Sequence, residues 1–188
     1  MDSCDPYSNR VRDYAQRIQE NGAVALSGLF DLTSGRLLRY AVNITRNQHD
    51  AEDALQATLL DVASKPERLA AADKPWPYLL QIVRNQSLLI LRKKKRAFYF
   101  ANLCDLLTQR TADPIEQQES NRAIWKALRK LPLEQREVVV LKIWEEMTFA
   151  QIAEILEVTP STAASRYRYA MEKLTRMLQV GSLEVAHD

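Results

Sequence analysis

The sequence predicts an all-α fold made of two small helical domains that are joined by a linker. Apolar residues recur every three to four positions through most of the 188 residues, as on the buried face of a helix. Only four glycines interrupt the chain, and 46% of its residues are hydrophobic. Runs of β-branched residues are sparse outside Val138–Val140, so no strand pattern competes with the helical one. A chain of this length can bury two modest cores.

The same periodicity sets the expected domain boundaries. We predict domains over residues 1–97 and 119–180, a linker over 98–118 and a short tail over 181–188. Residues 97–118 lose clear periodicity, and Asp113 followed by Pro114 stops any helix there. The two domains are therefore expected to fold separately.

Several classes of function find no support in the residues. Cys4 and Cys104 belong to no ligand motif, and His49 and His187 are isolated, so no metal site is readable. Neither a Gly-rich phosphate loop nor a carboxylate with a companion histidine is present. We expect no catalytic residue, no cofactor and no metal ligand. The N-terminus has no apolar signal segment and no window approaches a membrane span of about 18 residues, which indicates a cytoplasmic protein.

Charge carries more information by its distribution than by its sum. The formal net charge is +2, which identifies no partner class. Arg92–Arg96, however, is a run of five consecutive cations. Any nucleic-acid contact must therefore be argued from such local features.

The N-terminal domain opens with three short helical patterns. The first ends before Gly22, the second covers about residues 23–32, and the third covers 36–45, with Gly35 separating the last two. From Asp50 onward the amphipathic pattern is the clearest in the chain, with apolar residues at i, i+3, i+4, i+7, i+8 and i+11 from Ala51 to Val62. This pattern predicts one long helix.

The first turn of that long helix is crowded with acidic residues. Capping alone would explain them, because acids suit the positive end of a helix dipole. The alternative is a docking face, because Asp53 and Gln56 also lie off the apolar stripe. The candidate docking residues are Asp50, Glu52, Asp53 and Gln56.

A further helix is expected to follow a loop in which Pro75 and Pro77 hold Trp76 in an extended segment. It ends in the cation run, which could be a solvated helix end that suits the dipole. Five cations exceed that need, and with the upstream aromatic and amide groups they resemble a surface that grips phosphates and contacts bases. For Trp76, burial explains the residue as well as stacking does. The candidates are Trp76, Tyr78, Arg84, Asn85, Arg92, Lys93, Lys94, Lys95 and Arg96.

The C-terminal domain opens with an apolar face from Ile124 to Leu131. Val138–Val140 would suit a strand, but the preceding LEQRE and the lack of a partner strand favour a buried helix. Residues 148–174 then read as a helix-turn-helix. Thr148 and Gln151 form a capping box, and Thr159 before Pro160 starts the second helix.

The outward face of this second helix has short side chains followed by basic ones. Short residues let a helix enter a major groove, while Arg166 and Arg168 can reach phosphates or base edges. An ordinary α-hairpin is the simpler interpretation, but the four-residue turn 157–160 and the absence of acids from Val158 to Met171 favour DNA binding. The candidates are Pro160, Ser161, Thr162, Ala164, Ser165, Arg166 and Arg168.

Taken together, both halves resemble bacterial sigma factors of the extracytoplasmic-function group of the sigma-70 family, which contain the second and fourth conserved sigma regions. DAEDALQATLL (Asp50–Leu60) resembles the helix with which that family binds the clamp of core RNA polymerase. Residues Pro75–Arg96 resemble the part that melts and reads the minus-10 promoter element. Residues Leu131–Arg166 resemble the four-helix region that reads the minus-35 element.

The resemblance implies core RNA polymerase and promoter DNA as partners, the DNA being duplex at minus-35 and single-stranded at minus-10. An anti-sigma factor is a further partner that it allows. Some positions depart from the family pattern: Tyr78 replaces a usual tryptophan, Ala57 a frequent glutamate and Glu157 a frequent glycine. Ala164 replaces a longer polar or basic residue, so the promoter sequence is not transferable.

Two other functions remain open at this stage. A helix-turn-helix regulator could bind DNA without polymerase, and a sigma-like decoy could sequester an anti-sigma factor without touching a promoter. The retained Arg166, Arg168 and Arg92–Arg96 argue against the decoy.

Overall fold

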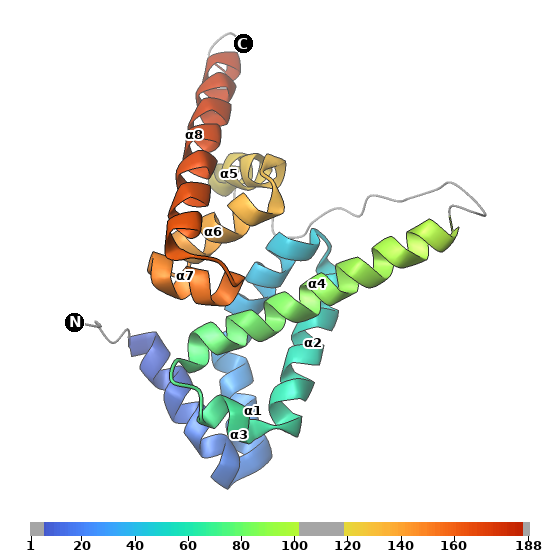
Figure 1. The fold of residues 1–188 in the computed structure, drawn as a ribbon, viewed down its shortest axis with the longest axis vertical. Helices are drawn as coiled ribbons and strands as arrows, with labels where there is room; N and C mark the ends of the chain where they lie inside the picture. The colour runs from blue at the N-terminus through green and yellow to red at the C-terminus, as the bar shows by residue number, and fades with distance from the viewer. Residues whose placement is uncertain (1–5, 102–118, 186–188) are drawn as a thin grey trace. The chain divides into compact units, whose positions relative to one another are not determined.

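The fold is that of a computed structural model, which describes residues 6–101 and 119–185. Within these ranges the regular structure is entirely helical, so the all-α prediction is confirmed (Figure 1). The chain divides into two compact units, Met1–Thr111 and Ala112–Asp188. Among the described helices, none combines the length and the apolar character that a membrane crossing needs.

The first unit begins with α1 (Pro6–Thr45), which doubles back on itself. The Tyr7 hydroxyl donates a hydrogen bond to the carbonyl oxygen of Leu32 at 3.2 Å, although a straight helix would separate these residues by about 37 Å. A Cβ on Gly28 would overlap the ring of Tyr14, so the two limbs of α1 touch where only glycine fits. The expected break at Gly35 is wrong: the helix runs through it, because the buried residues on both sides lie on one continuous face.

Three more helices complete the first unit: α2 (Gln48–Ser64), α3 (Pro66–Ala70) and α4 (Pro75–Ala101). α1 packs against both α2 and α4, and α2 packs against α4. Their core includes Tyr40, Leu37, Leu79 and Leu80, each almost completely buried. The apolar stripe of α2 faces this core as expected, since Ala51, Ala54, Leu55, Thr58 and Val62 are all buried.

The second unit contains α5 (Glu119–Lys130), α6 (Leu133–Ile143), α7 (Phe149–Leu156) and α8 (Pro160–Val185). Leu128 of α5 and Leu131, which directly follows this helix, pack with Val139 of α6 and with Ala170 and Leu174 of α8. The rings of Trp125 and Trp144 stack at the edge of this cluster, with 5.1 Å between centroids. Val138–Val140 are buried within α6, so the choice of helix over strand is confirmed.

The described helices extend beyond some of the boundaries drawn from the sequence. α4 continues to Ala101, past the start of the expected linker at residue 98, and α8 continues to Val185, into the expected tail. The rest of the linker, 102–118, and residues 186–188 lie outside the described part of the chain. Separately, α4 begins at Pro75, so Trp76 lies in the first helical turn and the expected extended segment is wrong.

Candidate nucleic-acid interface

The helix-turn-helix starts at a capping box on α7. The Thr148 N–H donates to Gln151 Oε1 at 2.8 Å, and the Gln151 N–H donates to Thr148 Oγ1 at 3.3 Å. Two backbone donors that lack partners inside the helix are thereby satisfied. The predicted capping box is confirmed, and it fixes where α7 begins.

The turn between α7 and α8 is equally well defined. Glu157 takes left-handed angles (φ 56°, ψ 47°), and the Val158 N–H reaches the carbonyl oxygen of Ala153 at 3.0 Å. This pairing closes the end of α7 in the manner of a Schellman motif. The cap of the next helix is Thr159, two residues after Glu157. The Thr162 N–H donates to Thr159 Oγ1 at 3.1 Å, so α8 starts at Pro160 as predicted.

The first three turns of α8 place the candidate DNA-reading residues on its outer face. Ala163 and Ala170 are completely buried, and Tyr167 between them packs against the core. Pro160, Ser161, Ser165 and Arg168 are exposed, and Thr162, Ala164 and Arg166 are half-buried.

The two arginines of this face differ in their surroundings. Arg166 points along the flank of α8 toward α6, where its Nη2 lies 3.8 Å from Glu134 Oε2. Arg168 is exposed, and its guanidinium lies 5.0 Å from the ring centroid of Tyr169. Glu134 thus restrains Arg166 loosely, while Arg168 stacks on its own helix.

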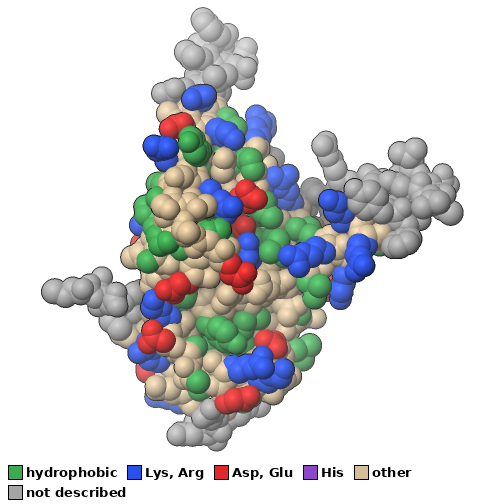
Figure 2. All heavy atoms as spheres, viewed as in Figure 1, with side chains coloured by type: hydrophobic (Ala, Val, Ile, Leu, Met, Phe, Trp, Pro, Cys, Tyr) green, Lys and Arg blue, Asp and Glu red, His purple; other side chains and the backbone are tan. Residues whose placement is uncertain are grey.

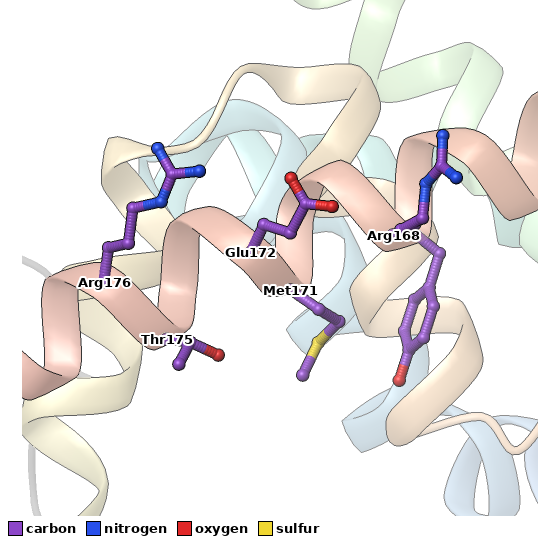
Figure 3. Close-up of a pocket in the computed structure, with 6 residues that line it drawn as sticks. Arg168, Met171, Glu172, Thr175 and Arg176 are labelled. Atoms are coloured by element: carbon purple, nitrogen blue, oxygen red, sulfur yellow. The ribbon is translucent and has the colours of Figure 1, made fainter.

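A hollow of about 580 Å³ follows the DNA-facing turns along α8 (Figure 3). Its lining comes from α8 alone: Tyr167, Arg168, Met171, Glu172, Thr175 and Arg176. In Figure 3 the side chains of Arg168, Glu172 and Arg176 extend to one side of the helix, while Met171 and Thr175 extend to the other. One helix provides no opposite wall to enclose a small molecule, so we assign no ligand to this hollow.

On α2 the four candidate docking residues separate into buried and exposed ones. Asp53 and Gln56 are exposed, and Glu52 is half-buried, with its carboxylate accepting a hydrogen bond from Gln48 Nε2 at 2.8 Å. Asp50 is only 5% exposed, so the prediction that it belongs to a surface face is wrong. Its carboxylate binds Lys94 of α4 instead, with Nζ 2.6 Å from Oδ1 and 2.8 Å from Oδ2.

Sequence reasoning missed Leu60, which is 68% exposed on α2. At 100° per residue it shares a face with Asp53 and Gln56, one to two turns further along. The available signal was its position off the apolar stripe. A single exposed apolar side chain is common on protein surfaces, so it is this shared face, and not its exposure alone, that adds Leu60 to the candidates.

Trp76, for which burial and stacking were both open, is buried at 2% exposure. Its ring meets the ring of Tyr7 edge to face at 5.0 Å between centroids, and the Arg36 guanidinium lies 3.9 Å from the Tyr7 centroid. In this conformation Trp76 does not present its ring to a base. Tyr78, two residues after Trp76 along α4, is half-buried.

The remaining candidates on α4 form an exposed stripe. At 100° per residue, Asn85, Arg92 and Arg96 share one face, and all three are exposed. Leu89 lies on this same face and is 43% exposed. Arg84 is half-buried, whereas Lys93 and Lys95 are exposed on the flanks. Figure 2 shows Lys and Arg side chains gathered over the C-terminal part of α4.

Comparison with known families matches both units. The model of sigma-70 region 2 matches residues 29–97, and that of sigma-70 region 4 matches residues 121–174. The chain is 30% identical over 172 residues to the RNA polymerase sigma factor CarQ of Myxococcus xanthus, covering 91% of this chain and 99% of the relative. It is 35% identical over 156 residues to the ECF RNA polymerase sigma factor SigM of Mycobacterium tuberculosis, covering 82% and 77%.

Solved structures agree on the fold. The sigma factor RpoE of Bartonella quintana, solved with the anti-sigma factor NepR, aligns with a TM-score of 0.69 at 22% identity, covering 82% of this chain and 96% of that one. CnrH, solved with the cytosolic domain of CnrY, aligns with a TM-score of 0.64 at 18% identity, covering 91% and 98%. At these identities the likeness concerns the fold alone.

Proposed function

The chain belongs to the extracytoplasmic-function group of sigma-70 factors, and we propose that α2 docks it on core RNA polymerase while α4 and α8 engage the promoter. As a sigma factor, it directs promoter-specific transcription initiation. The observation that carries the assignment of tasks is that three helices present exposed polar faces. In region 2 these are Asp53 and Gln56 on α2 and the basic stripe on α4, and in region 4 it is the outer side of α8.

The docking task is assigned to Glu52, Asp53, Gln56 and Leu60 of α2. A partner that covers Leu60 removes its exposed apolar surface from water, which favours binding. The acids and the amide around Leu60 then fix the orientation of the partner. Asp50 is left out of this set because α4 already covers it.

The minus-10 task is assigned to α4. Tyr78 is the aromatic group best placed to stack on an unpaired base, with Arg84 and Asn85 one to two turns further on. Opening a duplex costs about 1.4 kcal/mol of stacking per step. A base stacked on an aromatic ring returns about 1–3 kcal/mol, and phosphate contacts by Arg92, Lys93, Lys95 and Arg96 add to this.

The minus-35 task is assigned to the first turns of α8. Pro160, Ser161, Thr162, Ala164 and Ser165 are short enough to let the helix approach the floor of a major groove. Arg166 and Arg168 are long enough to reach base edges or phosphates beside it. The caps at Thr148 and Thr159 support this assignment, because they hold the two helices at a defined angle without help from DNA.

The decisive experiment adds the purified chain to sigma-free core polymerase on a library of genomic fragments and maps transcript starts. We expect discrete new starts that require both proteins and that share two sequence elements upstream. An Arg166→Ala, Arg168→Ala double variant, which keeps α2 intact, is the matched control and should bind polymerase but lose these starts. DNA binding without core-dependent starts would favour a regulator that acts alone. A chain that binds neither core polymerase nor DNA would favour a decoy.

A further inference from the structure

The burial of Asp50 raises the question of what its charge does. An isolated carboxylate at 5% exposure would be strongly destabilising, so its stabilising groups must be close. Two are present. Asp50 is the third residue after the N-cap Asn47, so it lies in the positive first turn of α2, and Lys94 Nζ contacts both of its oxygens.

Lys94 is the cation of the Arg92–Arg96 run that pairs with the buried carboxylate of Asp50. It is 44 residues away from Asp50 along the chain, and it joins the start of α2 to the C-terminal part of α4. Its side chain keeps 59% exposure, yet its ammonium is already paired with a buried carboxylate. Breaking such a pair by removing one partner leaves the other charge uncompensated.

The pair also determines which cations face outward. On a helix, Lys94 lies roughly opposite Arg92 and Arg96. Because Lys94 points at α2, the opposite face, with Asn85, Arg92 and Arg96, points away from α2 and into solvent. A rotation of this part of α4 would break the contact with Asp50, so the contact holds the stripe in its outward orientation.

We propose that Asp50 is a positioning residue for the DNA-binding end of α4, which withholds Lys94 from DNA and orients the other four cations of Arg92–Arg96. The proposal deepens the proposed function, because it assumes that this run contacts phosphates. It assigns Asp50 to the DNA-binding side of the protein rather than to polymerase docking. It also separates Lys94, which does not contact DNA, from the exposed Arg92, Lys93 and Arg96 of the same run, which do.

The test uses the full chain with fluorescent single-stranded oligothymidylate, because phosphate contacts need no particular sequence. The slope of log K against log salt counts the phosphates that are neutralised, at about 0.7 per contact on a single strand. Lys93→Gln, on an exposed neighbour, should flatten the slope by about that amount. Lys94→Gln, whose amide can still donate a hydrogen bond to Asp50 and so keep the contact, should leave the slope at its wild-type value.

Asp50→Asn provides the second arm. It removes the charge that holds Lys94, so the freed ammonium should steepen the slope by about 0.7 and tighten binding at low salt. The steepening should disappear in the Asp50→Asn, Lys94→Gln double variant, and Asp50→Glu should retain the wild-type slope. A purely structural role for Asp50 would lower the melting temperature without adding a salt-dependent contact.

Two results would overturn the proposal: a Lys94→Gln slope as flat as that of Lys93→Gln, or an unchanged slope in Asp50→Asn. Lys94→Gln keeps a hydrogen-bond donor for the buried Asp50 carboxylate, and the Lys94 side chain is itself 59% exposed, so this variant should fold and decides the question even if Asp50→Asn does not. Measuring core-polymerase binding separates failure of this inference from failure of the proposed function. If Asp50→Asn weakens polymerase binding as much as Asp53→Asn does, Asp50 is a docking residue and only this inference fails. A wild-type chain that binds no core polymerase contradicts the proposed function, while the slopes still judge the inference.

Discussion

The two units hold the helices that we propose to face DNA, α4 and α8, by different means. In the second unit the decisive contacts join residues three positions apart, Thr148 with Gln151 and Thr159 with Thr162. In the first unit they join distant segments, Asp50 with Lys94 and Tyr7 with Trp76. The reading helix α8 is thus fixed by its own turn, whereas α4 is fixed by the helices packed around it. Substitutions should therefore have local effects in one unit and effects across the whole unit in the other.

The largest effect is expected from Trp76→Ala. The indole is buried against Tyr7, and removal of a buried tryptophan costs about 3–5 kcal/mol. Urea unfolding followed by hydrogen exchange should show the loss in peptides of the first unit and leave those of the second unchanged. Trp76→Phe, which keeps a ring, should lose less. If stability were retained while single-strand binding disappeared, Trp76 would be a base contact and not a core residue.

Arg166→Ala tests the opposite unit. We expect a loss of about 1–3 kcal/mol in binding to the minus-35 element if the guanidinium makes a bidentate base contact. Competition between the element and a scrambled duplex measures it, with Arg168→Ala as the comparison on the exposed outer side of the same helix. An equal loss on both duplexes would make Arg166 a phosphate contact. The free energy of unfolding of the second unit should change little, because the ion pair of Arg166 with Glu134 is long, at 3.8 Å, and such surface pairs contribute little stability.

Thr159→Ala should act through the turn. The hydroxyl accepts the Thr162 N–H, and loss of such a cap costs about 1 kcal/mol. Thermal unfolding of the second unit should register the loss, and Thr159→Ser should restore most of it. If the first unit were also destabilised, α8 and α4 would not be held independently in their own units.

This contrast also explains how far the sequence could predict the molecule. The capping box, the start of α8 at Pro160 and the buried stripe of α2 follow from residue types at short spacing, and the structure confirms them. The burial of Asp50 and the partner of Lys94 depend on two helices meeting, which no short pattern specifies. Leu60 was missed because the docking candidates on α2 were all acids or amides, although Leu60 also lies off the apolar stripe. The roles of the site residues in docking and promoter reading remain predictions.

The smallest effect, and the most local, is expected from Glu157→Gly. Glu157 is held at φ 56°, a conformation that costs a residue with a Cβ about 1–2 kcal/mol and glycine almost nothing. Glycine also gains freedom in the unfolded chain, which offsets about 0.5–1 kcal/mol, so we expect a net stabilisation of about 0.5–1 kcal/mol.

Because the Glu157 side chain has contacts of its own, Glu157→Ala is the reference: it removes those contacts and keeps the Cβ. Glu146, at φ 54° in the same unit, offers an independent repeat of the comparison. Urea unfolding should rank glycine above alanine at both positions, with binding to the minus-35 element unchanged because the turn keeps its shape. A glycine variant less stable than the alanine variant at position 157 would mean that the left-handed backbone conformation of this residue does not limit the stability of the turn.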